Sequence, residues 1–251
     1  MSILGLPIQV YHFGLIFLRV GSMVMLIPAI GEGTVPPRLR LGLGLLLSIC
    51  LGPVAGPTLP PMPDGVGTMF GQLFKELFIG LMLGAILQIM RMALDVCGEI
   101  MSIQTTLAFS QTANPLEAQP GSSLGSFLGL VGVSLLFATN VHHLFIGAIA
   151  RSYVLFPPTK PPLLDDAAVM AVKTVSEAFG LGVQLAAPVI VFSLVFNIAT
   201  GLIGRLMPQF QIFFASSPLS VLLGLSIVML SLGLIGMVWL QRYQMFLQQF
   251  S

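Results

Sequence analysis

Six stretches of this chain are apolar enough, and nearly long enough, to cross a lipid bilayer, which takes about 20 such residues in a helix. Proline, often with glycine, lies in the segments between them, where it would end a helix. Open sheets cannot span lipid because their edge groups would stay unpaired. We therefore predict an all-α, membrane-associated fold. The six stretches are Ile8–Ile30, Leu39–Ala55, Phe70–Met92, Leu124–Ala150, Ala178–Ile203 and Leu219–Leu240.

The composition agrees with a membrane location and excludes one class of partner. Only 8% of the 251 residues are charged, 56% are hydrophobic, and the mean hydropathy is +0.99. Soluble domains carry about 25% charged residues. The formal charge of +1 provides no basic field for nucleic acid. Because Arg19 interrupts the first apolar run and no lysine or arginine precedes it, we expect a mature segment there, not a cleaved signal peptide.

A few charged residues nevertheless lie within or beside the apolar stretches. A charge at the bilayer centre costs at least about 2.5 kcal/mol, so we expect Arg19 to face a partner or water. Arg91, Asp95 and Glu99 follow one another at i, i+4 and i+8 and share one helix face. We interpret these three as an ion-pair strip, within the chain or between subunits. A proton relay is the alternative.

The distribution of cations does not indicate an orientation. If the six stretches alternate across the membrane, one side receives five lysines and arginines and the other receives four, which is no bias under the positive-inside rule. Gly52, Pro53 and Pro188 also interrupt apolar stretches. We therefore predict kinked or broken helices that are not simple alternating spans. The two sets of cations are Lys75, Arg151, Lys160, Lys173 and Arg242, and Arg38, Arg40, Arg91 and Arg205.

Pairs of glycines at helical spacing would let helices approach closely. Packing within this chain and packing against other subunits explain them equally well. The pairs are Gly80 with Gly84, Gly125 with Gly129, Gly201 with Gly204, and Gly233 with Gly236.

No constellation of residues in the sequence indicates catalysis or a metal site. His142 and His143 are adjacent, so in a helix they point about 100° apart and make poor joint ligands. Cys50 and Cys97 stand among apolar neighbours, and we expect both to be buried. Nucleotide-binding, hydrolase and metalloprotease motifs are missing. We predict a protein that is not an enzyme and has no cofactor.

Four stretches, in order along nearly the whole chain, resemble the FliR family of flagellar biosynthetic proteins. One begins at Arg19 and reads RVGSMVMLIPAIGEGTVPPRLRLGLGLLLSI; the second is GEIMSIQTTLAFSQTANP. A third is Asn140-x-His142-His143 followed by Ser152, Tyr153 and Pro157, and the last is GLIGRLMPQFQIFFASSPLSVLLGL. A single such motif would be weak, but four in register are specific.

This resemblance implies an export-gate subunit of a type III secretion system, with the matches favouring the flagellar one. One copy would assemble with several copies of FliP and FliQ, and with FlhB and FlhA, in the bacterial inner membrane at the flagellar basal body. The gate would pass unfolded protein substrates. The helices would form tilted hairpins, with a FliP-like part at about 1–160 and a FliQ-like part at about 161–251.

The resemblance also implies that the half-polar stretch after Gly98 projects into the pore as a plug loop. Its polar side chains would tolerate a wet lumen, and Phe109 could seal it. Family members often carry further aromatic residues just before the proline, where this chain has Thr112-Ala113-Asn114. An ordinary polar connector is the alternative. The matching residues are Gln104, Phe109, Gln111, Thr112, Asn114 and Pro115.

Arg205 and Gln209 carry the C-terminal match, and we predict that they make polar helix contacts. An interfacial arginine at a plain helix break is the alternative. For the chain as a whole, the competing function is a small-molecule secondary transporter, which also uses broken helices. Its internal repeat symmetry is not visible in the two halves of the sequence.

Overall fold

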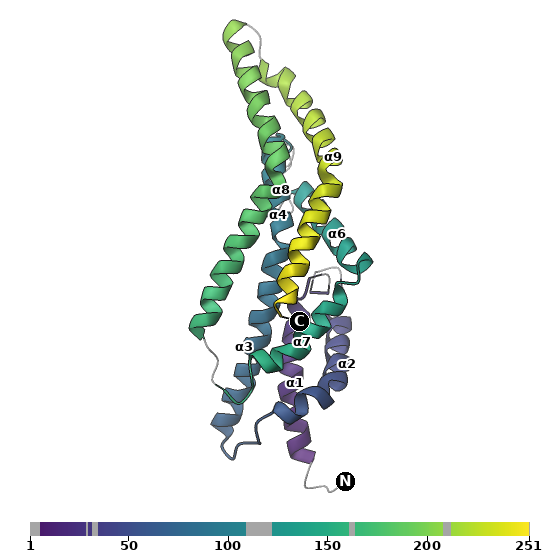
Figure 1. Cartoon of the computed structure of the whole chain (residues 1–251), viewed down its shortest axis with the longest axis vertical. Coiled ribbons are helices and arrows are strands. Elements are labelled where there is room, and N and C mark those ends of the chain that lie inside the picture. Colours follow the sequence, from purple (N-terminus) through teal and green to yellow (C-terminus); the bar gives the residue numbers. More distant parts are fainter. Residues whose placement is uncertain are drawn as a thin grey trace. The chain divides into compact units, whose positions relative to one another are not determined.

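The computed structural model describes residues 6–28, 30–31, 35–108, 122–160, 164–207 and 212–250, and all regular structure in these ranges is helical (Figure 1). This confirms the all-α prediction. Five of the described helices are long and apolar enough to cross a membrane, or six if the broken pair α6 and α7 counts as one span. The elements are α1 (Leu6–Leu26), α2 (Pro37–Ala55), η2 (Gly56–Thr58), α3 (Val66–Arg91), α4 (Ala93–Gln104), α6 (Ser123–Ala138), α7 (His142–Leu155), α8 (Leu164–Leu206) and α9 (Ile212–Gln248).

The chain divides into two compact units. The first unit comprises residues 1–90, 137–175 and 244–251, and the second comprises 91–136 and 176–243. The first unit therefore holds α1, α2, nearly all of α3, and α7. The second unit holds α4, nearly all of α6, and most of α8 and α9.

In the first unit, α1 packs closely against both α2 and α3. A Cβ on Gly44 of α2 would lie 3.3 Å from the Cα of Gly21 in α1. A Cβ on Gly80 of α3 would overlap Ser22 Oγ and the carbonyl oxygen of Arg19. These glycines let backbones approach where a larger residue would hold the helices apart.

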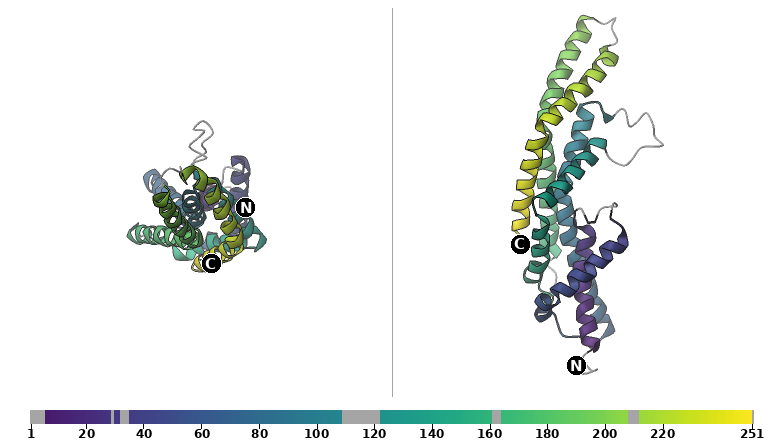
Figure 2. Two further views of the ribbon diagram at one scale, coloured as in Figure 1. Left: turned by 90° about the horizontal axis from the view of Figure 1, so that it is seen from above. Right: turned by 90° about the vertical axis from the view of Figure 1, so that its right-hand side faces the viewer.

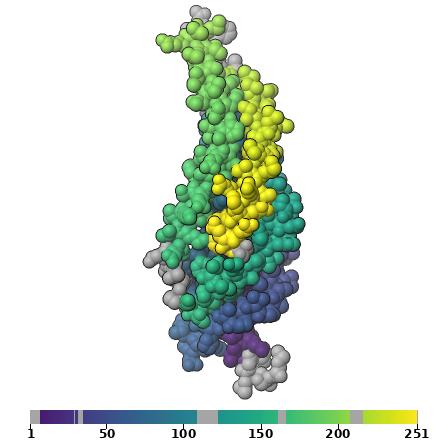
Figure 3. Space-filling view, in the orientation of Figure 1, coloured from purple at the N-terminus to yellow at the C-terminus, as the bar shows by residue number. Residues whose placement is uncertain are grey.

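In the second unit, α8 and α9 run side by side in opposite directions (Figures 1 and 2), and their side chains meet along the face shown in Figure 3. They have 43 and 37 residues, or about 65 and 55 Å at 1.5 Å per residue. The hydrocarbon core of a bilayer is about 30 Å thick. Each helix must therefore tilt strongly or extend beyond the core.

Prolines and one asparagine account for the differences from the predicted segments. The helix α8 continues through Pro188, α9 through Pro218 and α2 through Pro53, so none of these prolines breaks its helix. Helices in apolar surroundings tolerate proline where neighbours satisfy the freed carbonyl. The real break lies within the predicted stretch Leu124–Ala150. There Asn140 has a φ of 58°, a left-handed conformation that asparagine accepts more readily than most residues, and it separates α6 from α7.

The glycines divide into those used inside a unit and those left open. An added Cβ would lie 2.7 Å from Leu26 at Gly84, 2.9 Å from Ser122 at Gly125, and 2.9 Å from Leu135 at Gly236. At Gly201 and Gly233 an added Cβ would meet nothing within 4 Å. Internal packing therefore explains two of the four pairs, Gly80 with Gly84 and Gly125 with Gly129, and open surface remains on α8 and α9.

Candidate functional site

Arg19 of α1 is fully buried and binds the carboxylate of Glu76 in α3. Its Nε donates to Glu76 Oε2 at 2.5 Å, and its Nη2 donates to Glu76 Oε1 at 3.0 Å. Only 1% of the surface of Glu76 is exposed. Such a two-pronged pair satisfies both charges where water cannot reach them. The partner that the sequence required for Arg19 therefore belongs to the same chain.

The remaining donors of Arg19 bind the end of α7. Its Nη1 donates to the carbonyl oxygen of Ser152 and its Nη2 to that of Phe156, both at 3.0 Å. The ring of Tyr153 lies 4.4 Å from the guanidinium carbon. A cation at the C-terminal end of a helix interacts favourably with the last carbonyls and with the helix dipole.

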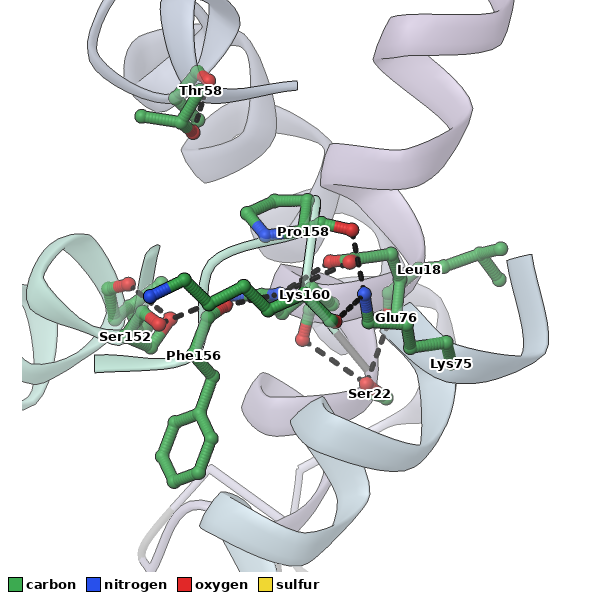
Figure 4. Close-up of polar contacts among 12 residues, drawn as sticks. Leu18, Ser22, Thr58, Lys75, Glu76, Ser152, Phe156, Pro158 and Lys160 are labelled. Carbon is green, nitrogen blue, oxygen red and sulfur yellow. Dashed lines mark hydrogen bonds and ion pairs between the residues drawn. The ribbon is translucent and has the colours of Figure 1, made fainter. Parts of the chain in front are cut away.

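Lys75, next to Glu76 in α3, binds the chain that follows α7. Its Nζ donates to the carbonyl oxygen of Pro158 at 2.5 Å and to that of Lys160 (Figure 4). We call Arg19, Lys75 and Glu76 the charged clamp. It gathers α1, α3 and the connection after α7 into one arrangement. Its groups bind one another and backbone carbonyls of the connection after α7, which suits them to positioning these segments.

The second unit carries the charged strip of Arg91, Asp95 and Glu99. Arg91 Nη2 donates to Asp95 Oδ2 at 2.8 Å, one turn further along. This pair lies over Gly129 of α6, where an added Cβ would come within 3.0 Å of Arg91 Nη1. Glu99 Oε2 accepts the backbone N–H of Ser122 at 3.1 Å. The strip thus holds the beginning of α6 against α4.

The last residue of α4, Gln104, is the first of the predicted plug residues. Its Oε1 accepts a hydrogen bond from Ser193 Oγ of α8 at 2.9 Å. Arg205 lies in the last turn of α8 and is exposed, which suits a cation at a helix C-terminus. The other predicted site residues lie outside the described part of the chain; these are Phe109, Gln111, Thr112, Asn114, Pro115 and Gln209.

Metal-ligating side chains do not cluster in the part of the chain that the structure describes, which holds no group of three such residues. The rings of His142 and His143 lie 4.3 Å apart, edge to face. Cys97 is buried as expected, but Cys50 is exposed on α2, so the prediction for Cys50 is wrong. An exposed position on a span of this kind suits a small apolar side chain as well as a core does.

Sequence reasoning missed Lys75, Glu76 and Ser193 as site residues. Glu76 carried a usable signal, because an acid within an apolar stretch should face a charge partner and Arg19 had the same need. Ser193 carried none, since a serine in a membrane helix usually bonds its own backbone, as Ser193 also does to Ile190.

Residues 10–246 match the model of a protein family described as bacterial export proteins, family 1. The flagellar biosynthetic protein FliR of Caulobacter vibrioides is 49% identical over 251 residues, which covers all of both chains. The chain belongs to the FliR family. FliR of Escherichia coli is 28% identical over 87% of this chain and 83% of its own length, and FliR of Aquifex aeolicus is 28% identical over 94% and 90%.

FliR-family membership and the membrane-length helices together make this chain an inner-membrane component of the flagellar export apparatus. The charged clamp and the strip then have a physical reason. Within a FliR-like membrane subunit, charges that cannot face hydrocarbon are bound to one another and to backbone groups.

Proposed function

We propose that this chain is a structural and gating subunit of the type III protein-export gate and that it contributes a plug loop to the pore. The observation that carries the proposal is the similarity to FliR over the full length of the chain. Unfolded flagellar subunits would pass through the gate across the inner membrane. Energy would come from elsewhere in the apparatus, because the sequence has no nucleotide-binding motif.

The geometry of α4 supports a plug role for the chain that follows it. Gln104 is tied to α8 through Ser193, and Glu99 is tied to the start of α6. The half-polar stretch therefore leaves from a fixed helix end. A hydrogen-bonded anchor of this kind would restrict the positions that a loop leaving it can reach.

Deleting Phe109 to Asn114 should make the closed gate leak ions, because the residues proposed to seal the lumen are removed. The measurement is membrane conductance in cells that carry the assembled apparatus but are not exporting. A second variant replaces the same six residues with glycine and serine, which keeps the length of the connection. It should leak as well. Conductance at the wild-type level in both variants would contradict the plug.

We also propose that the chain assembles with several copies of FliP and FliQ and with FlhB and FlhA. Much of the apolar surface of α8 and α9 is uncovered within the chain. Only 22% of the most apolar window of α9 is buried, and Leu230 is 87% exposed. Because these helices are longer than the hydrocarbon core, lipid can cover only part of that surface, and other subunits would cover the rest.

Purification should show this chain together with FliP and FliQ at unequal stoichiometry. The measurement is the mass and subunit ratio of the complex extracted from the membrane in mild detergent. A chain that elutes alone, or only with copies of itself, would instead favour a small-molecule secondary transporter.

The division into a FliP-like part at about 1–160 and a FliQ-like part at about 161–251 belongs to the same proposal. It is supported by α8 and α9, two long apolar helices in sequence that begin at Leu164. The two compact units described above follow spatial contacts and not chain order, so they group residues differently.

A further inference from the structure

The last part of α8 contains an uncharged run that matches the thickness of a membrane core. Between Gln184 and Arg205 lie 20 residues without a charged side chain, and all of them are helical. At 1.5 Å per residue this run is about 30 Å long, which equals the thickness of the hydrocarbon core. Asn197 is the thirteenth residue of the run. Its amide therefore lies well inside the core when the run spans it.

The side chain of Asn197 is exposed and makes no hydrogen bond with any residue that the structure describes. The hydroxyl groups of the same run are satisfied within α8. Ser193 donates to the carbonyl oxygen of Ile190 at 2.9 Å, and Thr200 donates to that of Phe196 at 3.0 Å. An amide without a partner is costly in hydrocarbon. Lipid is therefore an unfavourable neighbour for Asn197.

Water is an unfavourable neighbour for the same surface, because large aliphatic side chains flank the amide. Leu194 is 61% exposed and Ile198 is 57% exposed. Residues three and four apart are neighbours on a helix surface, so these two side chains, Asn197 and Gly201 form one patch. We call these four residues the Asn197 face. Aliphatic side chains that are exposed together usually mark a surface that another protein or the membrane covers.

Gly201 gives the Asn197 face room for a close neighbour. It lies one turn beyond Asn197, and an added Cβ would meet nothing within 4 Å. In membranes, a small residue lets a second helix come close, and a polar residue beside it can then form a hydrogen bond between the helices. A helix of another protein would cover the aliphatic side chains, use the space at Gly201 and pair the amide of Asn197. Neither lipid nor water does all three.

We infer that the Asn197 face docks a membrane-spanning helix of another export-gate subunit, which presents a hydrogen-bonding side chain to the amide of Asn197. This inference rests on the proposed function, because it names a site for the subunit contacts proposed above. An asparagine amide both donates and accepts. A charged partner at this depth would be costly, so the side chain that meets Asn197 is a hydroxyl or an amide.

Two substitutions on the Asn197 face should weaken assembly. Asn197→Leu removes the hydrogen bond and should lower the ratio of assembled to unassembled chain about threefold. If lipid covered the face, the same change would leave assembly unaltered, because leucine is the better neighbour for lipid. Asn197→Gln keeps an amide and should lose less than Asn197→Leu. Gly201→Leu fills the space that the docked helix needs and should lower the ratio about tenfold or more.

Two matched controls should assemble like the wild type. Ser226→Ala removes an exposed polar group of α9 that donates to the carbonyl oxygen of Leu222 in its own helix. Gly71→Leu makes the larger change at an exposed position of α3, where an added Cβ also meets nothing within 4 Å.

The measurement is the fraction of this chain found in the complex after extraction in mild detergent, divided by the total amount of the chain in the membrane. This division separates assembly from folding. Wild-type assembly in either Asn197→Leu or Gly201→Leu overturns the inference, while a complex that still contains FliP and FliQ leaves the proposed function intact. A wild-type chain that elutes alone would instead contradict the proposed function.

Crosslinking identifies what covers the face. A benzophenone side chain placed at position 198 in the assembled complex should crosslink to an apolar helix of a different subunit. A serine, threonine, asparagine or glutamine should lie within one turn of the crosslinked residue. Crosslinks only to lipid, only to a second copy of this chain, or to no protein overturn the inference.

Discussion

Glu76→Ala should prevent most of the protein from accumulating in folded form. The substitution leaves the guanidinium of Arg19 buried with no anion, since the exposed fraction of Arg19 is 0%. Removing one partner of a buried ion pair costs about 3–5 kcal/mol, which is a large share of the roughly 5–15 kcal/mol that stabilises a typical protein. The measurement is the yield and melting temperature of the protein extracted in detergent.

Three comparison variants test whether the charge pair is the cause. Glu177→Ala removes an exposed glutamate of α8 and should change stability by no more than about 1 kcal/mol. Glu76→Gln keeps the shape and one acceptor oxygen, so its loss should be smaller than that of Glu76→Ala. In Arg19→Met/Glu76→Leu both charges are gone, and stability should recover in part. A folded Glu76→Ala protein that melts like the wild type would show that Arg19 finds another partner.

The recovery in the double variant should be incomplete, for a reason specific to this site. Arg19 also binds the carbonyl oxygens of Ser152 and Phe156. Methionine cannot donate to them, so these acceptors lose a charge-assisted bond. The difference between the double variant and the wild type therefore measures how strongly Arg19 holds the end of α7, separately from its pairing with Glu76.

In the charged clamp, the sequence predicts that Arg19 needs a partner but does not predict which residue that partner is. Arg19 stands in an apolar stretch, where a charge needs a partner because its exposure to hydrocarbon is costly. The identity of the partner depends on how α1 and α3 face each other, which no local pattern records. Glu76 is 57 residues away along the chain, and Ser152 is 133 residues away. Contacts with backbone carbonyls are harder still to foresee, because every residue has one.

The ends of the helices were harder to predict from the sequence than their apolar centres. Hydropathy located the apolar part of each helix, but α8 begins at Leu164 and not at Ala178, because its first turns carry polar and charged residues. A helix that leaves the bilayer keeps its hydrogen bonds while its hydropathy falls. The break before His142 carried a weak signal, Thr139-Asn140, within an otherwise apolar run. The plug residues from Phe109 to Pro115 stay a prediction.

Gly98→Ala should strongly destabilise the second unit. A Cβ on Gly98 of α4 would overlap the Cα and nitrogen of Gly125 in α6 and would lie 2.8 Å from the carbonyl carbon of Leu124. These are backbone atoms, so no side chain can rotate away, and the two helices must separate. Overpacking costs typically about 1–3 kcal/mol when side chains can adjust, and here we expect the upper end or more. The measurement is the shift in melting temperature of the purified protein.

A glycine with free space around it should give the opposite result, a more stable protein when it is replaced by alanine. Comparing the two variants separates the effect of packing on stability from the effect of helix propensity. Gly201→Ala of α8 would meet nothing within 4 Å, so the alanine should stabilise the helix by about 0.5–1 kcal/mol. Both substitutions add one methyl group to a helix interior, and only one adds it between two backbones. Equal melting temperatures for the two variants would mean that α4 and α6 do not cross at Gly98. The crossing of α4 and α6 also sets where Glu99 meets Ser122. Separation of these helices would therefore move the base of the proposed plug. A Gly98→Ala protein that still assembles should leak ions.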